Sequence, residues 1–295
     1  MSEALESYDR ILRTCEPWII CRTAVRAGLD RAPLGIPIGE ANLIDPQRVA
    51  HGRFLHLVQV LDEMTYGPVG LKMPSWVFYD CAVVPGALFG FARRAAELEP
   101  WVRQSLRVPA DYDGLVPVSI VAAIPMAHRK AELVYTLCSV NQVAPGAAPE
   151  GLWRLTLAAG AAALGIDSMV ATAQWRSAQL GLYAGFGPLA LQTAWTPAHD
   201  IPETATFTVA SDAAARQRLL RGELPLPERA TRWLDADDRD AMRALQSEIE
   251  GGTPVWVVGP PEIRGAATRI PLQSGALDAP VAARDGAAWA RKFHG

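Results

Sequence analysis

The sequence predicts an α/β protein in which helices flank a mixed central sheet, with helical N- and C-terminal extensions. Residues 132–191 carry the clearest signal, because β-branched and aromatic runs alternate there with runs of good helix formers. The connections between these runs are short, which implies parallel strands joined by right-handed crossovers. Half of the 295 residues are apolar, so the chain can bury a sizeable core.

Residues 1–70 are expected to form the N-terminal helical extension. Residues 2–27 have an imperfect helical stripe of apolar side chains, and Trp18 is expected to lie on a docking face of these helices. Apolar side chains also recur at helical intervals over residues 49–64, and Gly67 follows this predicted helix.

Residues 71–210 are expected to form the α/β core. Its first strand is predicted over residues 75–84. Residues 87–106 are either a short strand leading into a helix or a single helix, and Gly90 argues against the single helix. Residues 114–126 read as another strand, whose two prolines indicate an edge or a bulge.

The second half of this core has the most regular pattern. The predicted order is strand 132–143, loop 144–151, helix 152–165, strand 167–175, helix 177–187 and strand 188–195. Gly165 suits the position after the first helix, Ser177 suits the N-cap of the second, and Gly187 suits its end.

Residues 211–295 are expected to form a mainly helical C-terminal extension with one short strand at residues 255–259. Ser211 is the predicted N-cap of its first helix. Asp235 begins a second predicted helix, where acidic residues favour the positive end of the helix dipole.

Composition and spacing exclude several classes of function. The net charge of −3 gives no reason to expect nucleic acid or a membrane surface as a partner. The four cysteines lack CxxC spacing and read as reduced thiols, and no apolar run approaches about 20 residues, so we expect a soluble, cytoplasmic protein. His51 and His56 are five residues apart and do not share a helix face, so no metal is expected.

Two segments resemble a known family. Residues 164–173 and 177–191 are similar to the second half of the GNAT superfamily, the acyl-CoA-dependent N-acyltransferases, with Leu182, Tyr183 and Gly187 on matching positions. The resemblance covers about sixty residues. It implies a GNAT-like sheet and the transfer of an acyl group from a thioester to the amine of a small molecule by direct attack.

The resemblance also implies acyl-CoA as a co-substrate, whose pyrophosphate would bind backbone amides at a helix N-terminus. The matching loop departs from the family pattern Q/R-x-x-G-x-G/A, because Pro145, Ala148 and Glu150 occupy its key positions. The cofactor-binding candidates are Val140, Gln142, Gly146 and Gly151. A degenerate loop leaves an acyl-carrier protein open as the donor.

Three residues are catalytic candidates. The resemblance implies that Tyr183 protonates the departing thiolate, and that amides near residues 138–140 hold the acyl carbonyl while Asn141 positions the amine. Asp80, in an otherwise apolar segment, is either the general base for the amine or half of a structural salt bridge. Each of two candidates also has a structural alternative to a catalytic role. Tyr183 would pack its helix onto the sheet, and Asn141 would form hydrogen bonds within its loop.

A second hypothesis is a non-catalytic protein of this fold, used for binding or assembly, that has lost the donor site. The missing loop pattern favours this hypothesis, and the Tyr183 segment argues against it. A homodimer stays open on the sequence.

Overall fold

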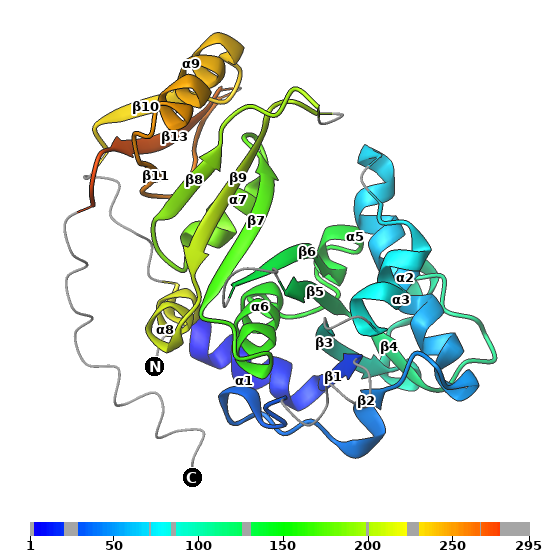
Figure 1. Cartoon of the computed structure of the whole chain (residues 1–295). Helices are drawn as coiled ribbons and strands as arrows, with labels where there is room; N and C mark the ends of the chain where they lie inside the picture. The colour runs from blue at the N-terminus through cyan, green and yellow to red at the C-terminus, as the bar shows by residue number, and fades with distance from the viewer. Residues whose placement is uncertain are drawn as a thin grey trace. The chain divides into compact units, whose positions relative to one another are not determined.

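The protein is a mixed α/β structure that divides into two compact units (Figure 1). The computed structural model describes residues 3–20, 29–70, 72–83, 87–125, 131–198, 201–222, 230–265 and 267–277. The first unit contains the described residues up to Ile166, and the second contains those from Asp167 onward. The division therefore falls inside the segment 71–210 that the sequence assigns to one core.

The first unit is built on a mostly antiparallel sheet. Its strands are β1 (Glu16–Ile20), β2 (Leu43–Ile44), β3 (Ala87–Arg94), β4 (Leu115–Pro117), β5 (Ser119–Pro125) and β6 (Ala131–Ser139). The order is β6–β5–β3–β1–β2, and β4 also pairs with β3. Among the pairings of β1, β2, β3, β5 and β6 within the described residues, only that of β1 with β2 is parallel.

Helices cover both faces of this sheet. They are α1 (Glu3–Thr14), α2 (Gly52–Tyr66), α3 (Ser75–Val83), α4 (Pro100–Ser105), α5 (Val140–Val143) and α6 (Leu152–Ala163). On one face α6 lies so close to the sheet that a Cβ at Gly160 would be 2.6 Å from Val121. On the other face Phe54 of α2 packs edge-on against Trp18 of β1. Figure 1 shows α6 beside α1.

Two irregularities shape the centre of this sheet. A Cβ on Gly90 would lie 1.9 Å from the carbonyl oxygen of Ser119, so only glycine fits there. In the ladder between β5 and β6, Ala122 pairs with Thr136 and Ala123 pairs with Val134. Tyr135 is therefore an extra residue on β6, which makes a β-bulge.

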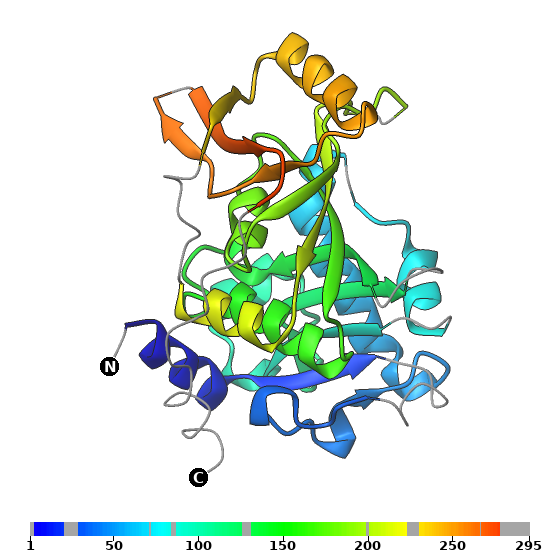
Figure 2. The ribbon, with the colours of Figure 1, turned by 60° about the vertical axis from the view of Figure 1, so that its left-hand side comes forward.

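The second unit has an antiparallel sheet (Figure 2). Its strands are β7 (Ser168–Gln174), β8 (Leu189–Thr193), β9 (Thr204–Ala210), β10 (Arg232–Asp235), β11 (Val255–Val257), β12 (Glu262–Arg264) and β13 (Ala267–Ser274). The order is β7–β9–β8–β11–β13–β10, and β12 pairs with β13. Because β9 lies antiparallel between β7 and β8, these two strands run parallel to each other, as predicted, but do not pair.

In the described residues of the second unit, three helices accompany this sheet. They are α7 (Ala178–Ala184), α8 (Ala213–Arg221) and α9 (Arg239–Glu250). α7 begins at Ser177, whose hydroxyl accepts a hydrogen bond from the Gln179 amide, as predicted. α8 is fastened to the end of α7 by the Arg218 guanidinium, which donates to the Phe186 carbonyl. α9 lies beside β10 and β8.

The predicted strand over residues 75–84 is wrong, because Ser75–Val83 is a helix. Val77 and Phe78 are buried, whereas Trp76, Tyr79 and Asp80 are exposed, which is a helical and not an alternating pattern. β-branched and aromatic content favours a strand only weakly, and packing on the sheet decides the outcome.

Trp18 is also placed differently from the prediction. It lies on strand β1 and pairs with Gly90 of β3, so part of residues 1–70 belongs to the sheet of the first unit. Residues 87–106 follow the first alternative, with strand β3 ahead of helix α4.

The C-terminal segment has more strands than the sequence predicts. β11 corresponds to the predicted strand, but β10, β12 and β13 are additional. The N-cap of α8 is Asp212 and not Ser211, and α9 begins after Asp238 while Asp235 ends β10. No helix in the described residues is long and apolar enough to cross a membrane.

Candidate functional site

The candidate site in the first unit is the segment between β6 and α6, where the sequence places the donor-binding residues. β6 ends at Ser139 and α5 begins at Val140. The Ser139 hydroxyl accepts from the Asn141 amide at 3.4 Å, and the Gln142 side-chain oxygen accepts from the Ser139 amide at 2.7 Å. This reciprocal capping box fixes the turn from strand to helix. The side-chain oxygen of Gln142 therefore already accepts a hydrogen bond from the backbone of its own turn.

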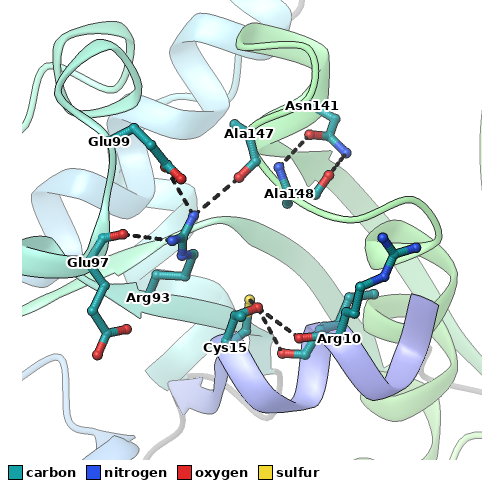
Figure 3. A network of polar contacts seen from close by, with 10 residues as sticks. Arg10, Cys15, Arg93, Glu97, Glu99, Asn141, Ala147 and Ala148 are labelled. Carbon is teal, nitrogen blue, oxygen red and sulfur yellow. Dashed lines mark hydrogen bonds and ion pairs between the residues drawn. The ribbon is translucent and has the colours of Figure 1, made fainter. Parts of the chain in front are cut away.

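Asn141 closes the loop that follows α5. Its side-chain oxygen accepts from the Ala148 amide and its side-chain nitrogen donates to the Ala148 carbonyl, each at 2.9 Å (Figure 3). Both ends of the side-chain amide thus bind one backbone unit seven residues away. The structure gives Asn141 the loop-bracing role that the sequence left as its alternative to positioning the amine.

Arg93 of β3 holds the same loop from the sheet. Its guanidinium donates to the Ala147 carbonyl at 3.4 Å and to the Glu97 carbonyl at 2.7 Å, and it pairs with Glu99 at 3.3 Å (Figure 3). Only 13% of the Arg93 side chain is exposed. A largely buried arginine with these partners stabilises the loop and lends positive charge beneath it.

Helix α1 fixes the last residues before α6. The Ser7 hydroxyl donates to the Glu150 carbonyl. Gly151 has φ of +83°, and a Cβ there would lie 2.9 Å from the ring of Tyr8, so conformation and space both require glycine. Burial raises the pKa of the Tyr8 hydroxyl, and the neighbouring Arg154 guanidinium opposes that rise.

The start of α6 has backbone hydrogen-bond donors for which the described residues supply no acceptor. Gly151 is the N-cap residue and supplies no side-chain cap. Within the described part of the chain, the backbone amides of Gly151, Leu152 and Trp153 meet no acceptor. These amides and the positive end of the α6 dipole favour an anion, Arg154 adds to the attraction, and the exposed Glu150 side chain opposes it.

The loop itself offers less than the family pattern implies. Pro145 and Pro149 have no amide hydrogen. The Ala147 amide donates to the Ala144 carbonyl, and the Ala148 amide is taken by Asn141. Gly146 has φ of +82° and serves the turn of this loop.

The Val140 amide does not fit the expected contact with an acyl carbonyl. It donates to the Val118 carbonyl at 2.7 Å and is already satisfied. The other position on β6 for such a contact is the bulge at Tyr135. Tyr135 is an extra residue without a partner on β5, so the strand ladder is locally open there.

Tyr183 and Asp80 lie in different units. Tyr183 is in α7 of the second unit, 3% exposed, with its ring 5.3 Å from that of Phe207 in an edge-on contact. Burial raises the pKa of the Tyr183 phenol, so it stays protonated at neutral pH. Asp80 is exposed on helix α3 and needs no buried partner. The expectation that Asp80 lies in a cleft or a salt bridge assumed a buried strand, and this segment is a helix.

A buried carboxylate on α2 is absent from the candidates that the sequence offers. Asp62 of α2 is 1% exposed and accepts hydrogen bonds from the Thr136 hydroxyl at 3.1 Å, the Met73 amide at 2.9 Å and the Cys138 thiol at 3.8 Å. Burial raises the pKa of Asp62. The signal was present, because Asp62 follows the fully buried Val58 by four residues and so lies on the same helix face.

Comparison with known proteins adds no family. No family model and no curated protein matches the chain. Among the described residues, no group of three or more histidine, cysteine, aspartate and glutamate side chains is arranged to hold a metal ion.

Proposed function

We propose that the protein transfers an acyl group from a thioester donor to the amine of a small molecule. The donor is acyl-CoA or an acyl group on a carrier protein. The observation that supports the proposal best is the start of α6. Consecutive amides that meet no acceptor in the described part of the chain follow there a loop braced by Asn141 and Arg93. Both kinds of donor carry phosphate, which is the ligand that such amides prefer.

A GNAT-like sheet is part of this proposal. The segments β6–loop–α6 and β7–α7–β8 support it, because they keep the order of strands and helices on which the resemblance rests. The helix between β7 and β8 carries Leu182 and Tyr183, and Gly187 follows it with φ of +147°.

In the proposed reaction the amine nitrogen attacks the carbonyl carbon and the carbon–sulfur bond breaks. The nitrogen of the new amide releases one proton to solvent water, and the departing thiolate takes up one proton. We assign the carbonyl contact to the amide at the Tyr135 bulge, since the Val140 amide is occupied. The resemblance alone assigns the role of proton donor to Tyr183, and burial keeps its phenol protonated at neutral pH. No general base is assigned, because Asp80 lies on an exposed helix face.

A second candidate function is binding or assembly without catalysis. The observation that favours it is the shortage of free amides in the loop. Pro145 and Pro149 have no amide hydrogen, and the amides of Ala147 and Ala148 already donate within the protein. The two candidates differ in whether the start of α6 binds a donor phosphate.

Calorimetric titration of the full chain with acetyl-CoA and with one long-chain acyl-CoA tests the proposal. We expect dissociation constants in the micromolar range, about −8 kcal/mol in free energy. Glu150→Gln removes the repulsion between the Glu150 carboxylate and a phosphate at the start of α6, so it should tighten binding by up to about fivefold. One charge near a helix N-terminus contributes about 0.3–1 kcal/mol. Glu40→Gln removes an exposed glutamate from another element of the same unit and should leave the affinity unchanged.

The opposite outcomes are equally specific. Failure of both ligands to bind, together with failure of an acylated carrier protein to associate, would favour the non-catalytic function. An affinity that is the same in Glu150→Gln and in the native protein would show that the donor phosphate does not bind at the start of α6.

A further inference from the structure

The second unit contains a cavity of about 340 Å³ between its sheet and the connection from β10 to α9. Its lining comes from the end of β7, the approach to β9 and the β10–α9 connection, and consists of Gln174, Trp175, Arg176, Ile201, Glu203, Ala236, Asp237 and Arg239. Typical small-molecule sites span about 300–1,000 Å³, so this cavity suits a small ligand and is too small for CoA.

The lining carries two positive and two negative side chains. Arg176 pairs with Asp237, and Arg239 pairs with Glu203 at 2.5 Å. Each pair joins the β7–β9 side of the cavity to its β10–α9 side. A ligand in the cavity therefore meets a guanidinium and a carboxylate from both sides.

These ion pairs contribute little to stability by themselves. The side chains of Arg176 and Arg239 are 63% and 66% exposed, and exposed pairs are typically worth about 0.2–1 kcal/mol each. A ligand that brings its own opposite charges can exchange with them at small cost. The pairs are thus better suited to recognition than to holding the two sides together.

The backbone around the cavity is fixed independently of these pairs. The Trp175 ring nitrogen donates to the Ala194 carbonyl at 2.9 Å, and the Trp175 amide donates to the Glu203 carbonyl at 3.2 Å. On the other side, the Asp235 carboxylate accepts from the Asp237 amide at 2.9 Å. The charges therefore project from a preformed frame, which lowers the cost of binding.

We propose that this cavity binds a small zwitterion with both a carboxylate and an ammonium group, that is, a free α-amino acid. The guanidinium groups of Arg176 and Arg239 together receive the carboxylate, and the carboxylates of Asp237 and Glu203 together receive the ammonium group. Ala236 and Ile201 contact the side chain. The inference concerns amino-acid binding alone, so the test of this cavity is independent of the test of the proposed acyl transfer.

Ligand-observed NMR of the full chain with each of the common L-amino acids tests the inference. At least one amino acid should bind, and its N-acetyl and carboxamide derivatives should lose binding because each lacks one charge. Arg239→Gln and Asp237→Asn should each weaken binding by about tenfold or more. Arg243→Gln is the matched control, because Arg243 forms an exposed ion pair on α9 without lining the cavity.

Three outcomes would overturn the inference. No common amino acid binds, the two cavity variants bind as well as the native protein, or a derivative that lacks one charge binds as well as the parent amino acid. Equal binding of the carboxamide would point to a peptide N-terminus in place of a free amino acid. The altered side chains are solvent-exposed, and unchanged melting temperatures will confirm that the variants fold.

Discussion

Replacing Asn141 by alanine should loosen the loop between α5 and α6 without unfolding the protein. The change removes two hydrogen bonds of 2.9 Å to the backbone of Ala148, a residue that is 8% exposed. A typical hydrogen bond contributes about 0.5–1.5 kcal/mol net, so the two together account for about 1–3 kcal/mol. That free energy corresponds to about a 5- to 150-fold change in the local opening equilibrium.

Hydrogen exchange of the Ala148 amide measures this opening directly. In Asn141→Ala its protection should fall by that factor, and affinity for the acyl-CoA donor should fall with it, because the loop leads into α6. Gln142→Ala is the matched control, since it removes one hydrogen bond at Ser139 and leaves the Ala148 contacts in place. Unchanged protection of the Ala148 amide in Asn141→Ala would refute the bracing role.

Three further predictions address the core, a buried acid and the proposed catalytic phenol. Gly90→Ala should destabilise the first unit by about 3 kcal/mol, the upper end for overpacking, because its Cβ would lie 1.9 Å from the Ser119 carbonyl oxygen; a normal urea midpoint would contradict this. Burial raises the pKa of Asp62 above its ordinary 3.8, so the folded state keeps a proton that the unfolded state releases. The native protein should therefore lose stability relative to Asp62→Asn as the pH rises from about 4 through the raised pKa, and parallel stability curves for the two proteins would rule this out. Tyr183→Phe keeps the ring packing on Phe207 and should slow thiol release from acetyl-CoA by about 100-fold at an unchanged melting temperature; equal rates would remove the acid role.

Local signals in the sequence predicted several features correctly. Ser177 caps α7, and Gly165 follows α6 with φ of +64°, as the sequence indicates. Both depend on interactions within a few residues, namely a side chain that reaches the next turn and a backbone conformation that favours glycine. The strands β7 and β8 were predicted for a similar reason, because their runs of apolar residues are short and bounded by turns.

The larger errors concerned predictions that depended on distant partners. Residues 75–84 have the composition of a strand, but α3 packs Val77 and Phe78 against the sheet and leaves Asp80 in solvent. Trp18 belongs to a strand because it pairs with Gly90, which is more than seventy residues away. Neither the partner strand nor the buried face can be read from a local window of sequence.

The sequence by itself determined the class of the protein, α/β, together with the end of α6 at Gly165, the start of α7 at Ser177 and a loop that departs from the pyrophosphate pattern. Only the tertiary structure decided what that loop does, because Arg93 reaches it from another strand and Tyr8 reaches it from the first helix. It also decided that charges from residues 174–176, 201–203 and 236–239 line one cavity. The physical reason is that backbone pairing and side-chain packing, and not distance along the chain, determine which polar groups become neighbours.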